Sequence, residues 1–361
     1  MRIRMHHRFV ISLWGIISCL WLSASPREVV VPELFFTQQR EKDNVDSSAV
    51  WHGPKGESWL ISTAKGTHRL LVDNAVNGYR VDWYGKAGKA LGEFNRPNGI
   101  SVVDDLLFVV ERDNRRVQVI ALPEFKPLFA FGEERLKYPY GLFVQHKADQ
   151  AGTYTIYITD DYGLPNDEIP PLSQLGARVQ CFEVTVSETE AVRPKARWMK
   201  SFGATEGEGV LRVVESIYGD VAYDRLLIAE EDESDDGRVV KVYDFEGNFS
   251  GKTMGKGLFH SQVEGITLVQ TGERSGYWVI TDQHPEKSRF LVFDRGTLAY
   301  VGAFSGERIR NTDGVWFERK SLGAAAPRGV FYAVNDDQGV AAISWLEVEK
   351  SLKLTDEGLE Q

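Results

Sequence analysis

The segment Arg96-Pro-Asn-Gly-Ile-Ser-Val102 contains the pattern that decides the fold. It places a glycine between polar and apolar residues, and polar and apolar residues then alternate. Side chains of a β-strand point alternately to its two faces, so this alternation predicts a short strand. A β-branched and aromatic run, a polar turn and a further apolar alternation follow, at Leu107–Val110, Glu111–Arg115 and Val117–Ile120. The whole stretch therefore predicts successive strands joined by turns.

The same unit occurs six times along the chain. Its first segment recurs at Asp46–Trp51, Arg96–Val102, Tyr138–Val144, Val214–Ile217, Val263–Leu268 and Thr312–Trp316. The small residues chosen as markers of these copies are Ala49, Gly99, Gly141, Ser216, Gly265 and Gly314. Successive markers lie 42 to 50 residues apart, except for one interval of 75. We expect a long insertion in that interval, supplied by the loop-forming residues of 161–176 and 187–197.

Six units of this length with several strands each are typical of a β-propeller. The sequence therefore predicts an all-β fold, a six-bladed β-propeller, over residues 26–350, followed by a C-terminal tail at 351–361. A ring of blades has to be closed. The β-rich segment Glu28–Phe35 precedes the first unit, and we expect it to pair into the last blade as an N-terminal closing strand.

Residues 1–25 predict a signal peptide for export. Arg2, Arg4 and Arg8 precede an apolar run that ends at Leu22, and small residues follow it. The run is short for a membrane span, so we expect no transmembrane segment in the mature chain and a secreted or periplasmic protein. The stretch that ends at Cys19 also matches a lipobox, and the alternative is a protein anchored by lipid on Cys19.

The charge of the chain limits its partners. The formal net charge is −10, and it becomes more negative when the basic leader is removed. This sign argues against nucleic acid and anionic membranes as partners and is compatible with cation binding. We expect a monomer.

Each unit carries a polar turn after its second strand, so all six turns should emerge on one face around the central channel. They are Thr63–Gly66, Glu111–Arg115, Asp160–Gly163, Glu230–Glu233, Asp282–Pro285 and Asn335–Gln338. Asp and Asn are also ordinary turn residues. Four consecutive acids at Glu230–Glu233 are different, because like charges on a tight turn repel unless a cation lies among them. Several hard oxygen ligands favour Ca²⁺.

A second group of acids lies in the marker segments. Glu215, Glu264 and Asp313 occupy nearly the same place in three successive units, next to the small residue. At the start of the inner strand, a carboxylate would face the mouth of the channel. Each could also be a solvated turn acid, and the recurrence in three units favours a functional site.

The motifs resemble two known families. Residues 96–119 look like an NHL repeat, which is a common propeller blade. A longer resemblance, over roughly residues 40–345, is to the β-propeller phytases. The segments that carry it are Asp46–Trp51, Thr63–Lys65, Tyr140–Leu142, Glu215, Ile228–Glu233, Val263–Thr267 and Thr312–Val315.

The phytase resemblance implies an exported, calcium-dependent phosphohydrolase that releases phosphate from phytate or a related phosphorylated small molecule, using a metal-activated water. It implies catalytic and metal-binding roles for Glu215, Glu231 and Glu264. Further metal ligands or neighbours would be Glu230, Asp313, Asp46 and Glu307. Phosphate would be bound by Lys65, Tyr140 and an arginine of the second turn, Arg112 or Arg115.

The sequence departs from the phytase pattern at several ligand positions. Ser47, Ser101 and Gln262 stand where that family has carboxylates, and Asp161 or Tyr162 stands where it has a lysine. Fewer ligands imply weaker metal binding, another phosphate ester or loss of catalysis. Two alternatives follow: a non-catalytic binding module, and a calcium-dependent lactonase-type hydrolase with one ion held by Glu215 or Glu264 together with Asn and Asp.

Overall fold

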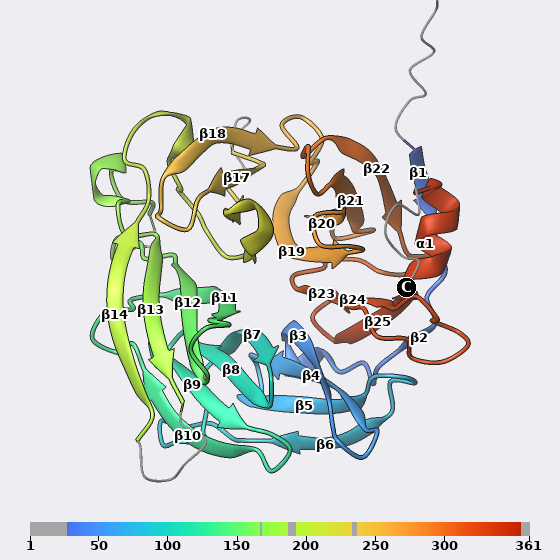
Figure 1. The fold of residues 1–361 in the computed structure, drawn as a ribbon, viewed down its shortest axis with the longest axis horizontal. Helices are drawn as coiled ribbons and strands as arrows, with labels where there is room; N and C mark the ends of the chain where they lie inside the picture. The colour runs from blue at the N-terminus through green and yellow to red at the C-terminus, as the bar shows by residue number, and fades with distance from the viewer. Residues whose placement is uncertain (1–26, 167, 187–192, 233–236, 355–361) are drawn as a thin grey trace, which may run out of the picture.

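The computed structural model describes residues 27–166, 168–186, 193–232 and 237–354. Within them the chain forms six sheets, antiparallel except for one added edge strand, arranged in a ring around a central channel (Figure 1), which confirms the predicted six-bladed β-propeller. The predicted signal peptide, Cys19 included, and Glu233 lie outside the described residues.

The first three blades each contain four strands in sequence order. Blade 1 consists of β3 (Val45–His52), β4 (Ser58–Ala64), β5 (Arg69–Asn74) and β6 (Arg80–Tyr84). Blade 2 consists of β7 (Pro97–Val103), β8 (Leu106–Glu111), β9 (Arg116–Ala121) and β10 (Lys126–Phe131). Blade 3 consists of β11 (Pro139–His146), β12 (Thr153–Asp160), β13 (Val179–Thr185) and β14 (Lys195–Phe202).

The remaining blades contain the C-terminal strands. Blade 4 consists of β15 (Ile217–Asp220), β16 (Arg225–Glu230), β17 (Val239–Tyr243) and β18 (Phe249–Met254). Blade 5 consists of β19 (Gln262–Gln270), β20 (Gly276–Gln283), β21 (Arg289–Asp294) and β22 (Tyr300–Ser305). Blade 6 consists of β23 (Val315–Glu318), β24 (Val330–Asn335) and β25 (Gly339–Ser344), completed from the N-terminal segment.

The N-terminal segment closes the ring, as predicted, but with fewer residues than predicted. Only β2 (Phe35–Phe36) pairs with β25 and so completes the last blade. The preceding β1 (Arg27–Val30) pairs in parallel with β22 and adds a fifth strand to blade 5. The segment thus bridges the last two blades, because Pro32 and the residues around it separate two short strands.

Helices are few in the described residues. Four short 3₁₀ turns are η1 (Glu41–Asp43), η2 (Leu172–Gln174), η3 (Gly207–Gly209) and η4 (Val221–Tyr223). One α-helix, α1 (Trp345–Leu352), follows β25, and its buried Trp345 packs on Phe304 and Phe317. None of the described helices has the length and apolar character that crossing a membrane requires.

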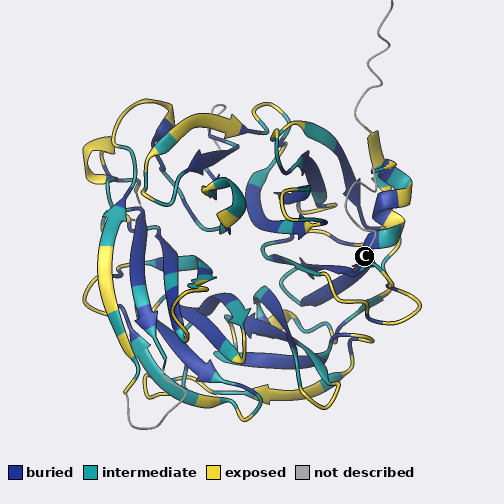
Figure 2. Cartoon of the chain, in the orientation of Figure 1, coloured by how far each residue is buried: buried dark blue, intermediate teal, exposed yellow. Residues whose placement is uncertain are grey.

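The core lies between neighbouring blades. The middle strands are buried on both faces, whereas several outer strands are exposed (Figure 2). Between blades 1 and 2, for example, Trp51, Ile61 and Val109 pack in one cluster, and the Trp51 indole donates a hydrogen bond of 2.8 Å to Asp105. Each blade therefore buries its faces against its neighbours, and the ring positions the loops of all six blades around one axis.

Candidate metal centre at the mouth of the channel

The first strand of each blade begins at the mouth of the channel, and the second strand returns to it. In blade 2, Pro97 at the start of β7 lies opposite Glu111 at the end of β8. The same pairing joins Pro139 to Asp160 and Val263 to Asp282. The marker segments and the polar turns therefore share one face, as the strand order predicted.

A bulge in the inner strand explains the small marker residues. Gly99, Gly141 and Gly265 lie where the strand register shifts, and each of them closely approaches the backbone of the next blade. A Cβ added to Gly141 would lie 2.3 Å from the carbonyl oxygen of Glu215, and one on Gly314 would lie 2.6 Å from that of Asp46. Blade 6 thus contacts blade 1 at Asp46 and Ser47. Ser47 is therefore the residue of blade 1 that corresponds to the markers of the other blades, and the predicted marker Ala49 was wrong by two residues.

The corrected register aligns one residue per blade at the start of the inner strand, and five of these six residues line the neck of the channel. The six, each directly before a marker, are Asp46, Asn98, Tyr140, Glu215, Glu264 and Asp313. Threonines one strand away hold these residues to the neighbouring blade. Thr63 donates a hydrogen bond of 2.7 Å to the Asn98 carbonyl, and Thr159 donates one of 2.5 Å to the Glu215 carbonyl. The repeat pattern pointed to Glu215, Glu264 and Asp313, because the motifs of blades 4 to 6 match, whereas Asp46 and Tyr140 were suggested only by the phytase resemblance.

Three glutamates from two blades converge at the mouth. One carboxylate oxygen from each of Glu215, Glu231 and Glu264 lies within 4.8 Å of the others. Glu231 and Glu264 are 4% and 5% exposed, and Glu231 Oε1 has no hydrogen-bond partner among the residues that the structure describes. Burial, and then the charges of neighbouring carboxylates, raise the pKa of all three well above its usual range. The structure therefore brings together the three predicted catalytic and metal-binding residues.

The three glutamates fit a calcium ion. Ca²⁺ lies about 2.4 Å from its oxygen ligands, so two ligands of one ion are at most about 4.8 Å apart. The buried Glu231 oxygen without a partner is the kind of atom that a cation satisfies. The neck lined by Tyr140, Glu215, Glu264, Asp46 and Asp313 has room of about 20 Å³, enough for a single water-sized occupant.

On the other side of the neck, Lys65 joins two further acids. Its Nζ lies 2.9 Å from Asp46 Oδ1 and 3.0 Å from Asp313 Oδ2. Burial disfavours the charged amine, but Asp46 and Asp313 outweigh it and raise the pKa of Lys65. Burial also raises the pKa of Asp313 to about 7, although Lys65 opposes this shift. The predicted residues Asp46, Asp313 and Lys65 thus form one ion-paired group.

Arg112 and Tyr140 form a third group, from blades 2 and 3. The Arg112 guanidinium lies 4.4 Å from the centre of the Tyr138 ring, and its Nη1 donates a hydrogen bond of 3.2 Å to the Tyr140 hydroxyl. Burial, together with the charge of Glu215, raises the pKa of Tyr140, so its hydroxyl stays protonated. Arg115 is exposed on the same turn and does not join the group.

Glu230 does not join the cluster, although the sequence suggested it as a ligand. Its carboxylate is fully buried and accepts hydrogen bonds from the backbone N–H groups of Arg212 and Val213, at 2.7 and 2.8 Å. The equivalent Asp160 and Asp282 bind the connecting loops of their blades in the same way. The last acid of the second strand therefore holds the connecting loop through hydrogen bonds, and in blade 4 the next residue, Glu231, lies at the mouth. Glu307 is exposed outside the cluster.

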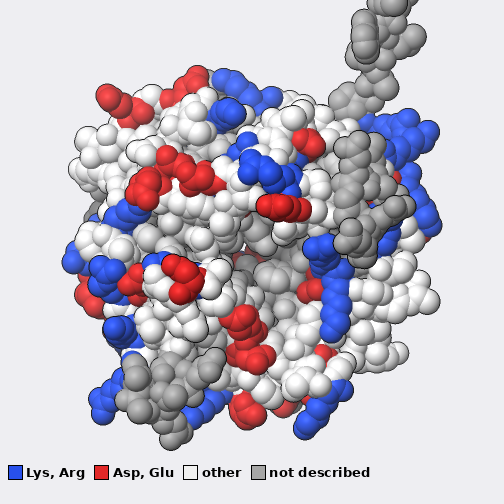
Figure 3. All heavy atoms as spheres, viewed as in Figure 1, with Lys and Arg blue, Asp and Glu red and all other residues white. Residues whose placement is uncertain are grey.

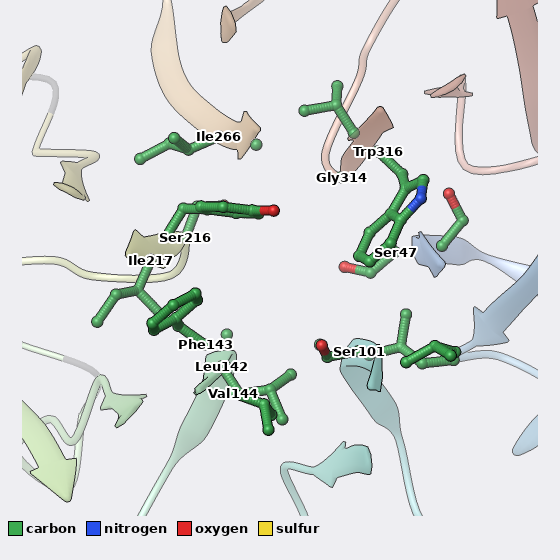
Figure 4. A pocket seen from close by; sticks show the side chains of 18 of the residues that line it. Ser47, Ser101, Leu142, Phe143, Val144, Ser216, Ile217, Ile266, Gly314 and Trp316 are labelled. Carbon is green, nitrogen blue, oxygen red and sulfur yellow. The ribbon is translucent and has the colours of Figure 1, made fainter. Parts of the chain in front are cut away.

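Below the neck the channel becomes mostly apolar. It has a volume of about 150 Å³ and is lined by Leu142, Phe143, Ile266 and Trp316, with Ser47, Ser101 and Ser216 as hydroxyl groups (Figure 4). Figure 3, viewed along this axis, shows a hollow at the centre of the disc. Two of the positions where the resemblance expects carboxylates, Ser47 and Ser101, line this channel. The charged site is thus confined to the mouth.

No protein-family model matches the chain, and no curated protein sequence matches it. Among solved structures, it is similar to hydrazine synthase of Kuenenia stuttgartiensis. The two share 13% sequence identity over 89% of this chain and 82% of the other, with a TM-score of 0.47.

Proposed function

We propose that the chain is a calcium-dependent phosphohydrolase that releases phosphate from phytate or a related phosphorylated small molecule. The observation that carries the proposal is the juxtaposition at one mouth of two unlike groups. The carboxylates of Glu215, Glu231 and Glu264 converge within 4.8 Å, and the guanidinium of Arg112 with the protonated phenol of Tyr140 lies in blades 2 and 3.

The carboxylates alone would repel a phosphate. A bound Ca²⁺ would reverse the local charge, polarise a phosphoryl oxygen and lower the pKa of a bound water. Glu215, Glu231 and Glu264 would hold this ion, and Glu231 is the ligand whose buried oxygen has no other partner. Glu231 and Glu264 are buried, and the lower dielectric constant around them strengthens their electrostatic interactions.

Arg112 and Tyr140 are suited to a phosphate oxygen. Arg112 Nε donates to Asp113 at 2.8 Å, and the Tyr138 ring supports the plane of the guanidinium, so the side chain is held in one orientation. Arginine binds phosphate through fixed, planar donors. Tyr140 offers a hydroxyl that remains a donor at neutral pH. Lys65 has a third N–H beyond the two that face Asp46 and Asp313.

The test is phosphate release from phytate and from a simple aryl phosphate, with millimolar Ca²⁺ and with chelator. We expect calcium-dependent release by the wild type and its loss in Glu231→Gln and Glu264→Gln. Glu307→Gln, an exposed acid outside the cluster, is the matched control and should keep full activity. Calcium-dependent stabilisation without cleavage of any ester would favour a binding module.

The lactonase-type alternative predicts one ion without phosphate-binding cations nearby. Arg112 and Lys65 both lie at the mouth, which favours the phosphate ester. Hydrolysis of a sugar lactone by the wild type, with no release from either phosphate ester, would reverse this preference.

A further inference from the structure

Lys65 already offsets one of the two negative charges of Asp46 and Asp313, and the oxygens of both carboxylates are hydrogen-bonded. Besides the two oxygens that face Lys65, Asp46 Oδ2 accepts a hydrogen bond of 2.7 Å from Ser47 Oγ. Asp313 Oδ1 accepts one of 2.5 Å from Gln283 Nε2. All four carboxylate oxygens therefore have a donor, and the side chains of Asp46, Lys65 and Asp313 are only 8%, 12% and 15% exposed.

Blades 4 and 5 present a comparable group of two inner-strand side chains and one side chain from a second-strand turn, and all three are acids. Glu215 and Glu264 belong to adjacent blades 4 and 5, as Asp313 and Asp46 belong to adjacent blades 6 and 1. The second-strand turn contributes Glu231 to one group and Lys65 to the other. One group therefore presents three acids to an ion, and the other presents two acids to an ammonium from the chain itself.

We propose that the Lys65 ammonium permanently occupies the second cation position of the mouth, so that the protein binds a single divalent ion, at Glu215, Glu231 and Glu264. The proposal deepens the proposed function, on which it rests for the first ion. With a single ion, only one phosphoryl group of the substrate can bind to metal. The third N–H of Lys65 would then be the second positively charged group that contacts the substrate.

The reason is electrostatic. Two carboxylates that share a buried pocket need a compensating charge, and removing one partner of such a group leaves an uncompensated buried charge. An ammonium at 2.9 to 3.0 Å provides that charge without any ion from solution. Asp337, from the β24–β25 turn, adds a neighbouring carboxylate: burial raises its pKa, the charge of Lys65 opposes this shift and that of Asp46 adds to it. Without the lysine, this oxygen-rich group resembles a site for a hard cation.

The experiment is the Ca²⁺ stoichiometry of the whole mature protein, measured by isothermal titration calorimetry at pH 8. We expect one ion for the wild type and for Lys65→Arg, and two for Lys65→Met. The double variant Lys65→Met/Asp313→Asn should return to one. A Lys65→Met protein that binds no more ions than the wild type, or a wild type that binds two, overturns the proposal.

Two controls separate this proposal from the proposed function. In a Glu231→Gln background the triad ion should be lost, and adding Lys65→Met should still create one Ca²⁺ site. Gain of that ion supports the role of Lys65 even if the wild type cleaves no phosphate ester. If Lys65→Met does not fold without calcium, the stoichiometry of the wild type decides alone: one ion supports the proposal and two overturn it.

Discussion

Neutralising one glutamate of the triad should stabilise the calcium-free protein, which is the reverse of the usual effect of altering a buried residue. The perturbation is Glu264→Gln, which keeps the shape and removes the charge. Glu264 lies 5% exposed against Glu215 and Glu231, within 4.8 Å. At an effective dielectric constant of about 20, two charges at that distance repel by about 3.5 kcal/mol.

The folded protein limits this repulsion by keeping protons. When the folded state raises the pKa of a Glu, stability at higher pH falls by about 1.4 kcal/mol for every tenfold weakening of its acidity. Because the folded pKa is raised, this loss is absent below the unfolded pKa and grows as pH rises. We therefore expect Glu264→Gln to stabilise the calcium-free protein by roughly 2 to 5 kcal/mol at pH 8 and hardly at all at pH 4.

The assay is thermal unfolding in chelator at both pH values. Unfolding entropies near 2 cal/mol/K per residue convert this gain into a rise in Tm of about 3 to 7 °C for a chain of 361 residues. Glu307→Gln should not change the Tm. With calcium present, the order should invert, since only the wild type keeps all three ligands. A Glu264→Gln protein that melts below the wild type in chelator at pH 8 would refute the reasoning.

Three further predictions concern the rest of the mouth. Calcium at a thousandfold excess over its Kd should stabilise the wild type by about 4 kcal/mol, or roughly 5 °C in Tm. This stabilisation should be smaller at pH 5 than at pH 8, because protons compete with calcium for the carboxylates. An equal shift of the Tm at both pH values contradicts the prediction. Arg112→Lys should raise KM for a phosphate ester about 10-fold or more with the Tm unchanged, because the planar guanidinium and its hydrogen bond to Tyr140 are lost. Steady-state kinetics measure KM, and an unchanged KM would show that Arg112 does not bind the substrate. Thr159→Val should lower the free energy of unfolding by about 1 to 2 kcal/mol, because the Glu215 carbonyl loses the donor that joins blade 3 to blade 4. Denaturant unfolding measures this change, with the exposed Thr297→Val as the control.

The polar turns show where the sequence stopped being informative. Glu230 and Glu231 are adjacent acids in one run, and composition gives no reason to separate them. In the structure one binds the backbone of a connecting loop and the other faces Glu215 and Glu264. Consecutive residues at a strand end point in different directions, so the role of each depends on where the strand stops.

The marker of the first blade shows the same limit. The inner strand carries a bulge, and a bulge adds a residue without disturbing the apolar pattern on either side. The pattern therefore allowed Ala49 as well as Ser47, and only the contact of Gly314 with Asp46 and Ser47 distinguishes them. The sequence also predicted one closing strand over Glu28–Phe35, whereas the structure divides this segment between two blades. Residues that favour β-structure do not specify which sheet edge they join.

The sequence by itself determined the blade number, the all-β fold and the common face of the turns, since these follow from short-range alternation and a repeat along the chain. Tertiary structure alone decided which polar groups meet. Lys65 and Asp313 are separated by 248 residues and come together only because the ring closes. Glu215, Glu231 and Glu264 likewise belong to two blades whose relative position is set by packing between sheets. Periodicity is a local property of the chain, whereas an ion site depends on distances between segments that the chain does not connect directly.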